Sequence, residues 1–421
     1  MSFAAWLLLF GLVSSTSFAQ LTIESCHEKA RSNFPMIKQY GIIEKTQEYN
    51  LANANKNYLP QLDISIIGGI LEGMPSIGAS DTEDSGLNMN MISMLQFNQV
   101  IWDGGITKAS KTAIEANGEI AKSSLDVTLY ALEDKINNLY FGILLIDEQV
   151  KQMDILLSTL DRNYKRVKIA VENGTALLSD LDEIKVEVLN TTQKQTDLTF
   201  NRSAYLNVLS AMIGEHFDDS VILEMPKHVL ASLSDSIQRP ELNVYNNKRM
   251  SVEAQRNINK AMLLPKVGIM GFGTFIQPGV DFGSSSLDNI LVAGLSVNWS
   301  LGSLYKHSNN EKLLDLDLKK VALEQETFLF NKNLELQQFK VDFMRYQSQI
   351  AQDKELLVLK QRIKTAYDTK YENGTCTMSA LLDRVNDESM AQQSLTVHQI
   401  QYLLKVYQYQ ILTGNRTQKN Y

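Results

Sequence analysis

The sequence predicts a mainly helical protein that also contributes β-strands to a membrane. Three observations lead to this fold class. The chain contains two copies of one unit, its prolines leave two long stretches free of helix breakers, and four segments alternate polar and apolar residues. Each copy then supplies one β-hairpin and one long helical hairpin. Because a sheet edge cannot stay open in lipid and four strands cannot close a barrel, several chains must share one barrel.

The two copies are recognised by matching prolines, a matching tryptophan and a matching turn. These landmarks are Pro35 with Pro240, Pro60 with Pro265, Trp102 with Trp299, and VENGT at 171–175 with YENGT at 371–375. Such regular offsets indicate internal duplication with small changes in the loops. The predicted organisation is a signal peptide at 1–19, a first repeat at 20–225 and a second repeat at 226–421.

Composition and the first twenty residues indicate an exported chain that folds. Of its 421 residues 44% are hydrophobic and 21% are charged, which is ordinary for a folded protein. An apolar run from Ala4 to Val13 precedes Ser17-Phe18-Ala19, which fits a leader-peptidase site. That run is too short to span a bilayer as a helix. The formal net charge of −8 disfavours nucleic acid as a partner.

Heptad-like spacing predicts a coiled-coil seam in each repeat. Apolar residues recur in steps of three and four from Leu125 to Val171. The same phase returns 200 residues later, but three of its positions are polar, namely Asp353, Lys360 and Lys364. Because Leu359 and Ile363 each precede one of the two lysines, we expect the apolar stripe of the second seam to be displaced onto them.

Each seam ends at the repeated pentapeptide, which predicts the turn of a helical hairpin. Asn173-Gly174 and Asn373-Gly374 tolerate the left-handed conformation that ends a helix, and Thr175 and Thr375 are expected to cap the next helix. The outgoing helix from about 108 to 171 is longer than the return helix that ends near 212. Stacking the return helix on the 35–60 segment would balance the two, which gives a bundle roughly 100 Å tall.

Period-two segments predict β-hairpins at 61–101 and 266–300. The second strand of each hairpin has one apolar face, and a long polar loop joins the two strands. Trp102 and Trp299 follow these strands and are expected at the membrane interface. The alternative is a pair of soluble hairpins on a helical core, which a period of two does not exclude.

With these features in place, the sequence resembles the TolC family of outer-membrane efflux and secretion channels. The resemblance rests on LTIESCHEKARSNFP, the Leu-Pro before each first strand, QVIWDGG, and the turn sequences GTALLSDL and GTCTMSALLD. It implies a homotrimer in which each chain gives four strands to a 12-stranded barrel and its helices to a periplasmic α-barrel. The chain departs from the family at Leu301-Gly302 and at Ala380, where an acidic residue is common.

The resemblance implies a passive exit duct in the outer membrane of a Gram-negative bacterium, with a long periplasmic extension. An inner-membrane pump and a periplasmic adaptor would be its partners, besides outer-membrane lipid, in efflux or type I secretion. No catalytic motif, cofactor site or metal site is apparent, and Cys26, His27 and Cys376 are interpreted as scattered surface residues. The alternative is an exported coiled-coil adaptor or scaffold that never enters the membrane.

The turns would lie at the periplasmic mouth of such a duct. Family resemblance points to Asp180 and Asp383 as pore-end positions, with Tyr371 opposite Asp180 as a lock. The other interpretation of these carboxylates is solvation near helix N-termini, where the helix dipole favours negative charge. Adaptor docking is expected at the two turns themselves, through Asn173, Gly174, Thr175, Asn373, Gly374 and Thr375.

Overall fold

The computed structural model describes residues 21–70, 89–226, 235–277 and 288–415. The predicted signal peptide and most of the predicted polar loop in each β-hairpin lie outside these ranges. The described elements are α1 (Ile23–Asn33), η1 (Pro35–Lys38), α2 (Gln39–Lys56), β1 (Gln61–Ile70), β2 (Met89–Trp102), α3 (Ile106–Glu172), α4 (Leu178–Ile213), α5 (Glu241–Ala261), β3 (Lys266–Gln277), β4 (Asp288–Asn298), α6 (Gly302–Glu372) and α7 (Met378–Thr413). The predicted fold class, mainly helical with four strands, is confirmed.

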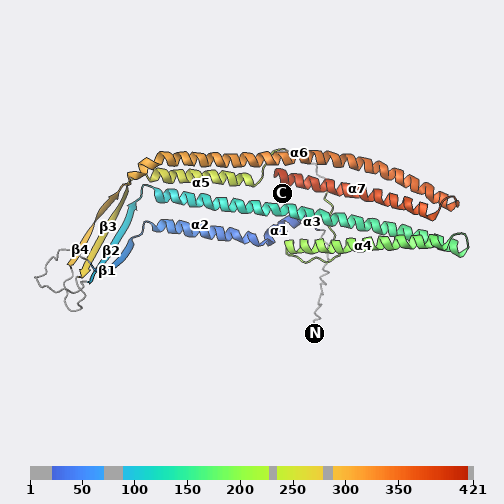
Figure 1. Cartoon of the computed structure of the whole chain (residues 1–421), viewed down its shortest axis with the longest axis horizontal. Coiled ribbons are helices and arrows are strands. Elements are labelled where there is room, and N and C mark those ends of the chain that lie inside the picture. The colour runs from blue at the N-terminus through green and yellow to red at the C-terminus, as the bar shows by residue number, and fades with distance from the viewer. Residues whose placement is uncertain (1–20, 71–88, 227–234, 278–287, 416–421) are drawn as a thin grey trace, which may run out of the picture. The chain divides into compact units, whose positions relative to one another are not determined.

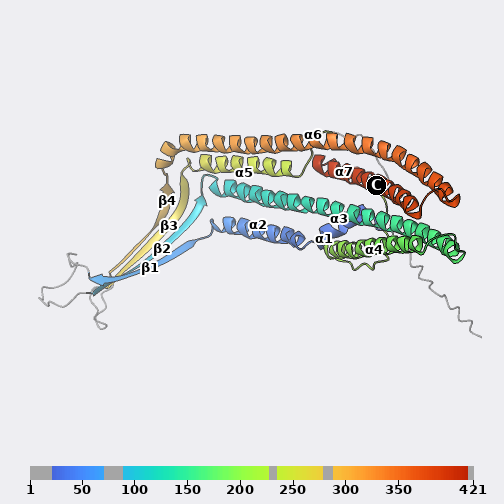
Figure 2. The same ribbon diagram turned by 45° about the vertical axis from the view of Figure 1, so that its right-hand side comes forward.

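The chain divides into two compact units that cut across the sequence repeats. The hairpin unit comprises residues 1–37, 128–239 and 330–421, and the sheet unit comprises residues 38–127 and 240–329. In the hairpin unit, α4 lies beside the C-terminal part of α3 and α7 beside that of α6 (Figure 1). In the sheet unit, α2 lies beside the first part of α3 and α5 beside the first part of α6 (Figure 2).

The four strands of the sheet unit form one antiparallel sheet in the order β1-β2-β3-β4. Its register puts Leu62 opposite Phe97, Ile64 opposite Leu95 and Gly271 opposite Ala293. Directly opposed residues share a face, so the apolar residues predicted to face one way do so across all four strands. Most of the large side chains on this face are exposed: Leu62, Ile64, Ile66, Leu95, Ile269, Leu291, Leu295 and Val297.

The predicted seam of α3 is buried as expected. Every seam position from Leu125 to Val171 is buried or half-buried, and Ile136, Ile143 and Leu160 are fully buried. These residues form the cores of the hairpin unit together with α1, α4 and α7. The 3.5-residue spacing thus identified the face of α3 that packs.

The seam of α6 keeps its phase, so the prediction that it shifts onto Leu359 and Ile363 is wrong. Those two side chains are 44% and 41% exposed, whereas the polar seam residues Asp353, Lys360 and Lys364 are half-buried. Each polar residue meets a partner of opposite charge or a histidine on α7. Ion pairing across the interface therefore takes the place of apolar packing at these positions.

The repeated pentapeptide makes the same turn twice. Gly174 and Gly374 have φ of 70° and 68°, the left-handed conformation that glycine adopts without a steric cost. The expectation that Thr175 and Thr375 cap the next helix is wrong. Their hydroxyls donate to the carbonyls of Ala170 at 3.0 Å and Lys370 at 2.9 Å, so they complete the preceding helix. The N-cap residues of the return helices are Leu177 and Thr377.

A short helix that sequence periodicity did not reveal, α1, completes the main core. Thr22 caps it by accepting a hydrogen bond from the Ser25 N–H, and Ile23, Cys26 and Ala30 face inward. Cys26 is fully buried, so its interpretation as a surface residue is wrong. Burial raises the pKa of its thiol to about 12. Cys26 and Cys376 are both free cysteines.

Candidate functional site

The turns of the two helical hairpins belong to the hairpin unit and are packed by one apolar cluster. The cluster includes Leu160 and Val167 of α3, Leu181 and Ile184 of α4, and Met378, Leu381, Leu382 and Val385 of α7. Tyr367 and Tyr371 of α6 pack against it. The three helices that carry the predicted gate residues, α4, α6 and α7, therefore share one core with α3 at this end.

Arg166 of α3 links the two hairpins through α6. Its guanidinium lies 3.6 Å from the Asp368 carboxylate and 3.3 Å from that of Glu372, and it stands over the Tyr371 ring at 5.4 Å from the centroid. Arg166 also donates a hydrogen bond to Asn163, a buried residue of its own helix. This is the densest set of polar contacts between the hairpins at the turns, and sequence reasoning missed it.

The predicted Tyr371 and Asp180 are neighbours but make no direct hydrogen bond. Burial, and after it the negative charge of Asp180, raises the pKa of the Tyr371 hydroxyl, while Arg166 lowers it. Asp180 accepts a hydrogen bond from the Leu177 N–H at 3.2 Å and so caps α4. Among the described residues, then, Tyr371 has Arg166 as its charged contact and Asp180 serves the helix terminus.

Asp383 lies exposed in the second turn of α7. The next residue, Arg384, is turned toward the α6 interface, where it contacts Asp387 at 2.8 Å and the Tyr367 ring. Asp383 is therefore available to whatever adjoins this side of α7. Asn173 and Asn373 are exposed at the two turns, which matches a contact surface but does not identify a partner.

The two tryptophans lie where the second strand of each hairpin ends. Trp102 is the last residue of β2 and stands opposite Val267, and Trp299 follows β4 and donates its indole N–H to the Leu263 carbonyl at 3.0 Å. Both side chains are about half exposed. Each tryptophan thus adjoins the exposed apolar face of the sheet at its helical end, and β1 and β4 each pair with only one strand in the described chain.

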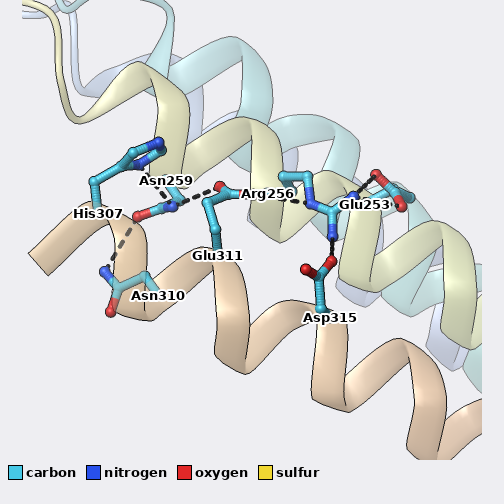
Figure 3. Close-up of polar contacts among 7 residues, drawn as sticks. All are labelled: Glu253, Arg256, Asn259, His307, Asn310, Glu311 and Asp315. Carbon is cyan, nitrogen blue, oxygen red and sulfur yellow. Dashed lines mark hydrogen bonds and ion pairs between the residues drawn. The ribbon is translucent and has the colours of Figure 1, made fainter.

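The helices on either side of the second hairpin of the sheet, α5 before it and α6 after it, are joined by a polar network. Arg256 of α5 lies between three carboxylates, with ion pairs of 3.2 Å to Glu253, 3.1 Å to Glu311 and 2.5 Å to Asp315 (Figure 3). The buried Asn259 donates to Glu311 at 2.7 Å and contacts the His307 ring at 3.0 Å (Figure 3). Because the buried Asn259 side chain finds its hydrogen-bond partners within the protein, we interpret this network as a structural contact between α5 and α6.

Two other kinds of feature are absent from the described ranges. No group of three or more histidine, cysteine or acidic side chains there is arranged to hold a metal ion. None of the helices described is both long and apolar enough to cross a membrane. The strands of the sheet unit and the turns of the hairpin unit are therefore the features on which a function can be argued.

The fold is that of known outer-membrane channels. The outer membrane protein VceC from Vibrio cholerae superposes with a TM-score of 0.67 at 14% identity, over 93% of this chain and 96% of that one. CusC, described as forming a transmembrane channel, gives 0.67 at 14% identity over 94% and 92%. The open state of the MtrE outer membrane channel from Neisseria gonorrhoeae gives 0.66 at 12% identity over 93% and 88%.

The likeness is one of structure alone. No family model matches the sequence, and no curated protein matches it either. TM-scores of 0.66–0.67 at identities of only 12–14% show a shared fold, and the fold expected from the resemblance to the TolC family is thereby confirmed. The function of the chain has to be argued from its own residues.

Proposed function

We propose that the chain is an outer-membrane channel that serves as a passive exit duct of a tripartite efflux pump or a type I secretion system. The observation that carries this is the four-stranded sheet, because most of its exposed large apolar side chains lie on one face although they belong to a folded unit. Exposing such an apolar face is favourable where it contacts lipid. The solved structures with this fold, named as outer-membrane channels, support the same assignment.

A homotrimer follows from the edges of the sheet. β1 and β4 each have one unpaired edge among the described strands, and unpaired backbone groups are costly in lipid. Pairing β1 of one copy with β4 of the next, three times, closes a barrel of 12 strands. Two copies would give eight strands, whose interior is filled by side chains and conducts nothing.

The helical hairpins would then form a periplasmic extension whose six turns surround its mouth. We assign Arg166, Tyr371, Asp180 and Asp383 to closing that mouth, and the two Asn-Gly-Thr turns to docking a periplasmic adaptor. The adaptor would connect the duct to an inner-membrane pump that supplies the energy. The segment at 1–19 would direct the chain out of the cytoplasm.

The direct test of the duct is purification from outer membranes followed by planar-bilayer recording. We expect a trimer that leaves the membrane only with detergent, dissociates on heating and conducts ions. A monodisperse monomer in buffer without detergent would instead favour the alternative, an exported coiled-coil adaptor or scaffold. Cell fractionation separates these two functions before any recording is made.

The gate assignment is tested by Arg166→Ala against Arg162→Ala. Arg162 lies one turn earlier on α3, and its hydrogen bonds among the described residues go to Ser158 and Thr159 of its own helix. Arg162→Ala is therefore a matched loss of charge. We expect Arg166→Ala to raise single-channel conductance severalfold, because the contacts to Asp368 and Glu372 are lost, and Arg162→Ala to leave it near the original value. Equal effects of the two variants would remove Arg166 from the gate.

The Asp383 assignment has a separate readout. Three Asp383 carboxylates around one opening would attract cations, so the closed mouth should select cations and be blocked by multivalent ones. We expect Asp383→Ala to lower both selectivity and block. Unchanged selectivity and unchanged block would identify Asp383 as ordinary solvated surface at the start of α7.

A further inference from the structure

A cavity of about 730 Å³, open to solvent on part of its surface, lies between α3, α6 and α7 in the hairpin unit. Its apolar wall consists of Met225, which follows α4, and of Ile350, Ile400 and Leu403. Pockets for drug-sized molecules have volumes of about 300–1,000 Å³, so this cavity has room for one. None of the gate or docking residues assigned above lines it. The cavity is therefore a separate feature of the hairpin unit.

Four polar side chains of the cavity wall have no hydrogen-bond partner among the described residues. They are Gln152 of α3 and Gln392, Thr396 and Gln399 of α7. Thr396 is only 7% exposed, although a buried hydroxyl without a partner costs free energy and is uncommon in folded proteins. These four side chains therefore leave donors and acceptors available to a molecule bound in the cavity.

The first repeat uses its polar groups at the equivalent positions for contacts within the protein. α4 and α7 have the same length, and their equivalent positions lie 200 residues apart. Thr196, the counterpart of Thr396, donates a hydrogen bond of 2.9 Å to a carbonyl of its own helix. Asp154, the counterpart of Lys354, accepts one of 2.6 Å from Gln195 of α4. The unused polar groups of the cavity are thus a property of the second repeat and do not come with the helical hairpin.

Lys354 of α6 gives the cavity an uncompensated positive charge. Glu148 of α3, the other charged residue of the wall, is paired with Lys151 at 2.5 Å. Asp353, which precedes Lys354, contacts His398 of α7 at 2.5 Å. Lys354 itself is exposed and has no ion pair within the described ranges. The wall therefore favours a ligand with a negative charge.

We propose that this cavity binds an amphipathic organic anion, a molecule with an apolar body and one carboxylate or sulfonate group. The apolar body packs against Ile350, Ile400 and Leu403, and its removal from water favours binding. The ammonium group of Lys354 donates a charge-assisted hydrogen bond to the anionic group. The Thr396 hydroxyl and the unpaired glutamine amides provide further hydrogen bonds. A ligand that is only apolar or only charged leaves part of this wall unused.

The anion site goes beyond the duct proposed above and does not rest on it. All of its residues belong to one chain and one compact unit, so binding requires neither a barrel nor conduction. A protein that conducts ions but does not bind the anion would overturn the site alone. A protein that binds the anion but forms no channel would overturn the duct alone.

The test is equilibrium dialysis of naphthalene-2-sulfonate against the full-length protein in a nonionic detergent, with protein-free micelles as the blank. The uncharged naphthalene-2-sulfonamide has the same ring system and is the matched ligand. We expect about one sulfonate per chain, bound about twofold to fivefold more tightly than the sulfonamide, which is the size of one partly exposed ion pair. Equal binding of the two ligands, or no binding of the sulfonate, would overturn the proposal.

A pair of lysine variants tests the charge. Lys354→Gln should lower the affinity for the sulfonate to that for the sulfonamide, because the ammonium group is lost. Lys194→Gln removes an exposed lysine of α4 that does not line the cavity, so it should leave both affinities unchanged. Equal losses of affinity in the two variants would show that the sulfonate responds to the overall charge of the protein, and would overturn the role of Lys354.

Filling the cavity tests its position. Gln399→Trp places a bulky side chain in it from α7 and should abolish the binding of both ligands while the helical circular dichroism stays that of the original protein. Gln152→Trp fills it from α3, and covers the case in which the first variant does not fold. Sulfonate binding that persists in a folded tryptophan variant would overturn the site.

Discussion

The two helical hairpins have return helices of equal length and the same turn, but the contacts between their two helices differ. α4 and α7 both have 36 residues, and both turns carry a left-handed glycine at the same place. In the first hairpin the α3 seam is apolar throughout and mostly buried. In the second, α6 presents Asp353, Lys360 and Lys364 to α7, while Leu359 and Ile363 stay exposed.

The two hairpins therefore share their backbone geometry, whereas the chemistry of their helix interfaces differs. Helix length and turn shape are fixed by backbone hydrogen bonds, which any helix-forming sequence supplies. Interface chemistry depends on pairs of residues that change together. An apolar seam gains free energy from all the surface it buries, whereas a partly buried ion pair gains little net free energy because its charges lose water. We therefore expect the first hairpin to behave as the rigid element and the second as the adjustable one.

The largest expected effect concerns the cysteines, one beside each hairpin. Burial raises the pKa of the Cys26 thiol from 9.0 to about 12, so the reactive thiolate is about a thousandfold scarcer at neutral pH than for an ordinary thiol. Cys376, at the second turn, is half-buried and donates only a weak hydrogen bond, at 3.7 Å, to the Tyr367 carbonyl. Timed labelling with a maleimide should modify one thiol per native chain and two after denaturation. Cys376→Ser should abolish labelling of the native protein. Labelling of the native Cys376→Ser variant would contradict the buried position of Cys26.

The next largest effect is the loss of stability when one side chain of each seam is truncated to alanine. Leu160→Ala removes a fully buried side chain from the α3 seam and should cost about 2–5 kcal/mol of the free energy of unfolding. Lys360→Ala at the counterpart position should cost under about 1 kcal/mol, because the lysine is partly exposed and Asp387 keeps Arg384 as a partner. Urea unfolding followed by circular dichroism measures both. Similar losses of unfolding free energy in the two variants would show that the two seam positions contribute equally to stability.

Sequence reasoning found the parts of the molecule that backbone geometry controls. The turns at Gly174 and Gly374, the α3 seam and the shared apolar face of the strands were all predictable, because each depends on spacing within one segment. The burial of Cys26, the α7 partners of the α6 seam and the role of Arg166 were not. Each depends on which residue a distant segment places opposite, and a single sequence does not record that. Among the predicted site residues, Tyr371 meets Arg166, and Asp180 caps α4.

A smaller effect distinguishes the C-terminal ends of the two return helices. Gly214 and Gly414 both have left-handed φ, at 77° and 76°, so alanine is strained at either position by about 1 kcal/mol. At Gly414 a new Cβ would also lie 2.5 Å from the Gln238 carbonyl oxygen, whereas at Gly214 it would meet the side chain of Asn33. A side chain can rotate away and a backbone carbonyl cannot. We therefore expect Gly414→Ala to lower the melting temperature more than Gly214→Ala does, and the reverse order would contradict the fixed position of Gln238.

The smallest expected effect is the response of the two hairpins to salt. Raising NaCl from about 0.1 to 1 M shortens the screening length from about 10 to 3 Å and weakens partly exposed ion pairs. Lys360–Asp387 at 2.9 Å and Lys364–Glu388 at 3.0 Å are about one quarter exposed, so the α6 and α7 amides near them should exchange about twofold faster at high salt. Hydrogen exchange at fixed pH should show a smaller change near Leu156 and Leu160, which are buried in the apolar cluster. Lys360→Leu with Lys364→Tyr, which copies the α3 residues, should remove the response, because the interface then has no charge on α6 at these positions. Equally faster amide exchange in both hairpins of the original protein would mean that salt acts on the helices generally. The difference between an apolar and an ionic seam would then have no measurable effect on stability.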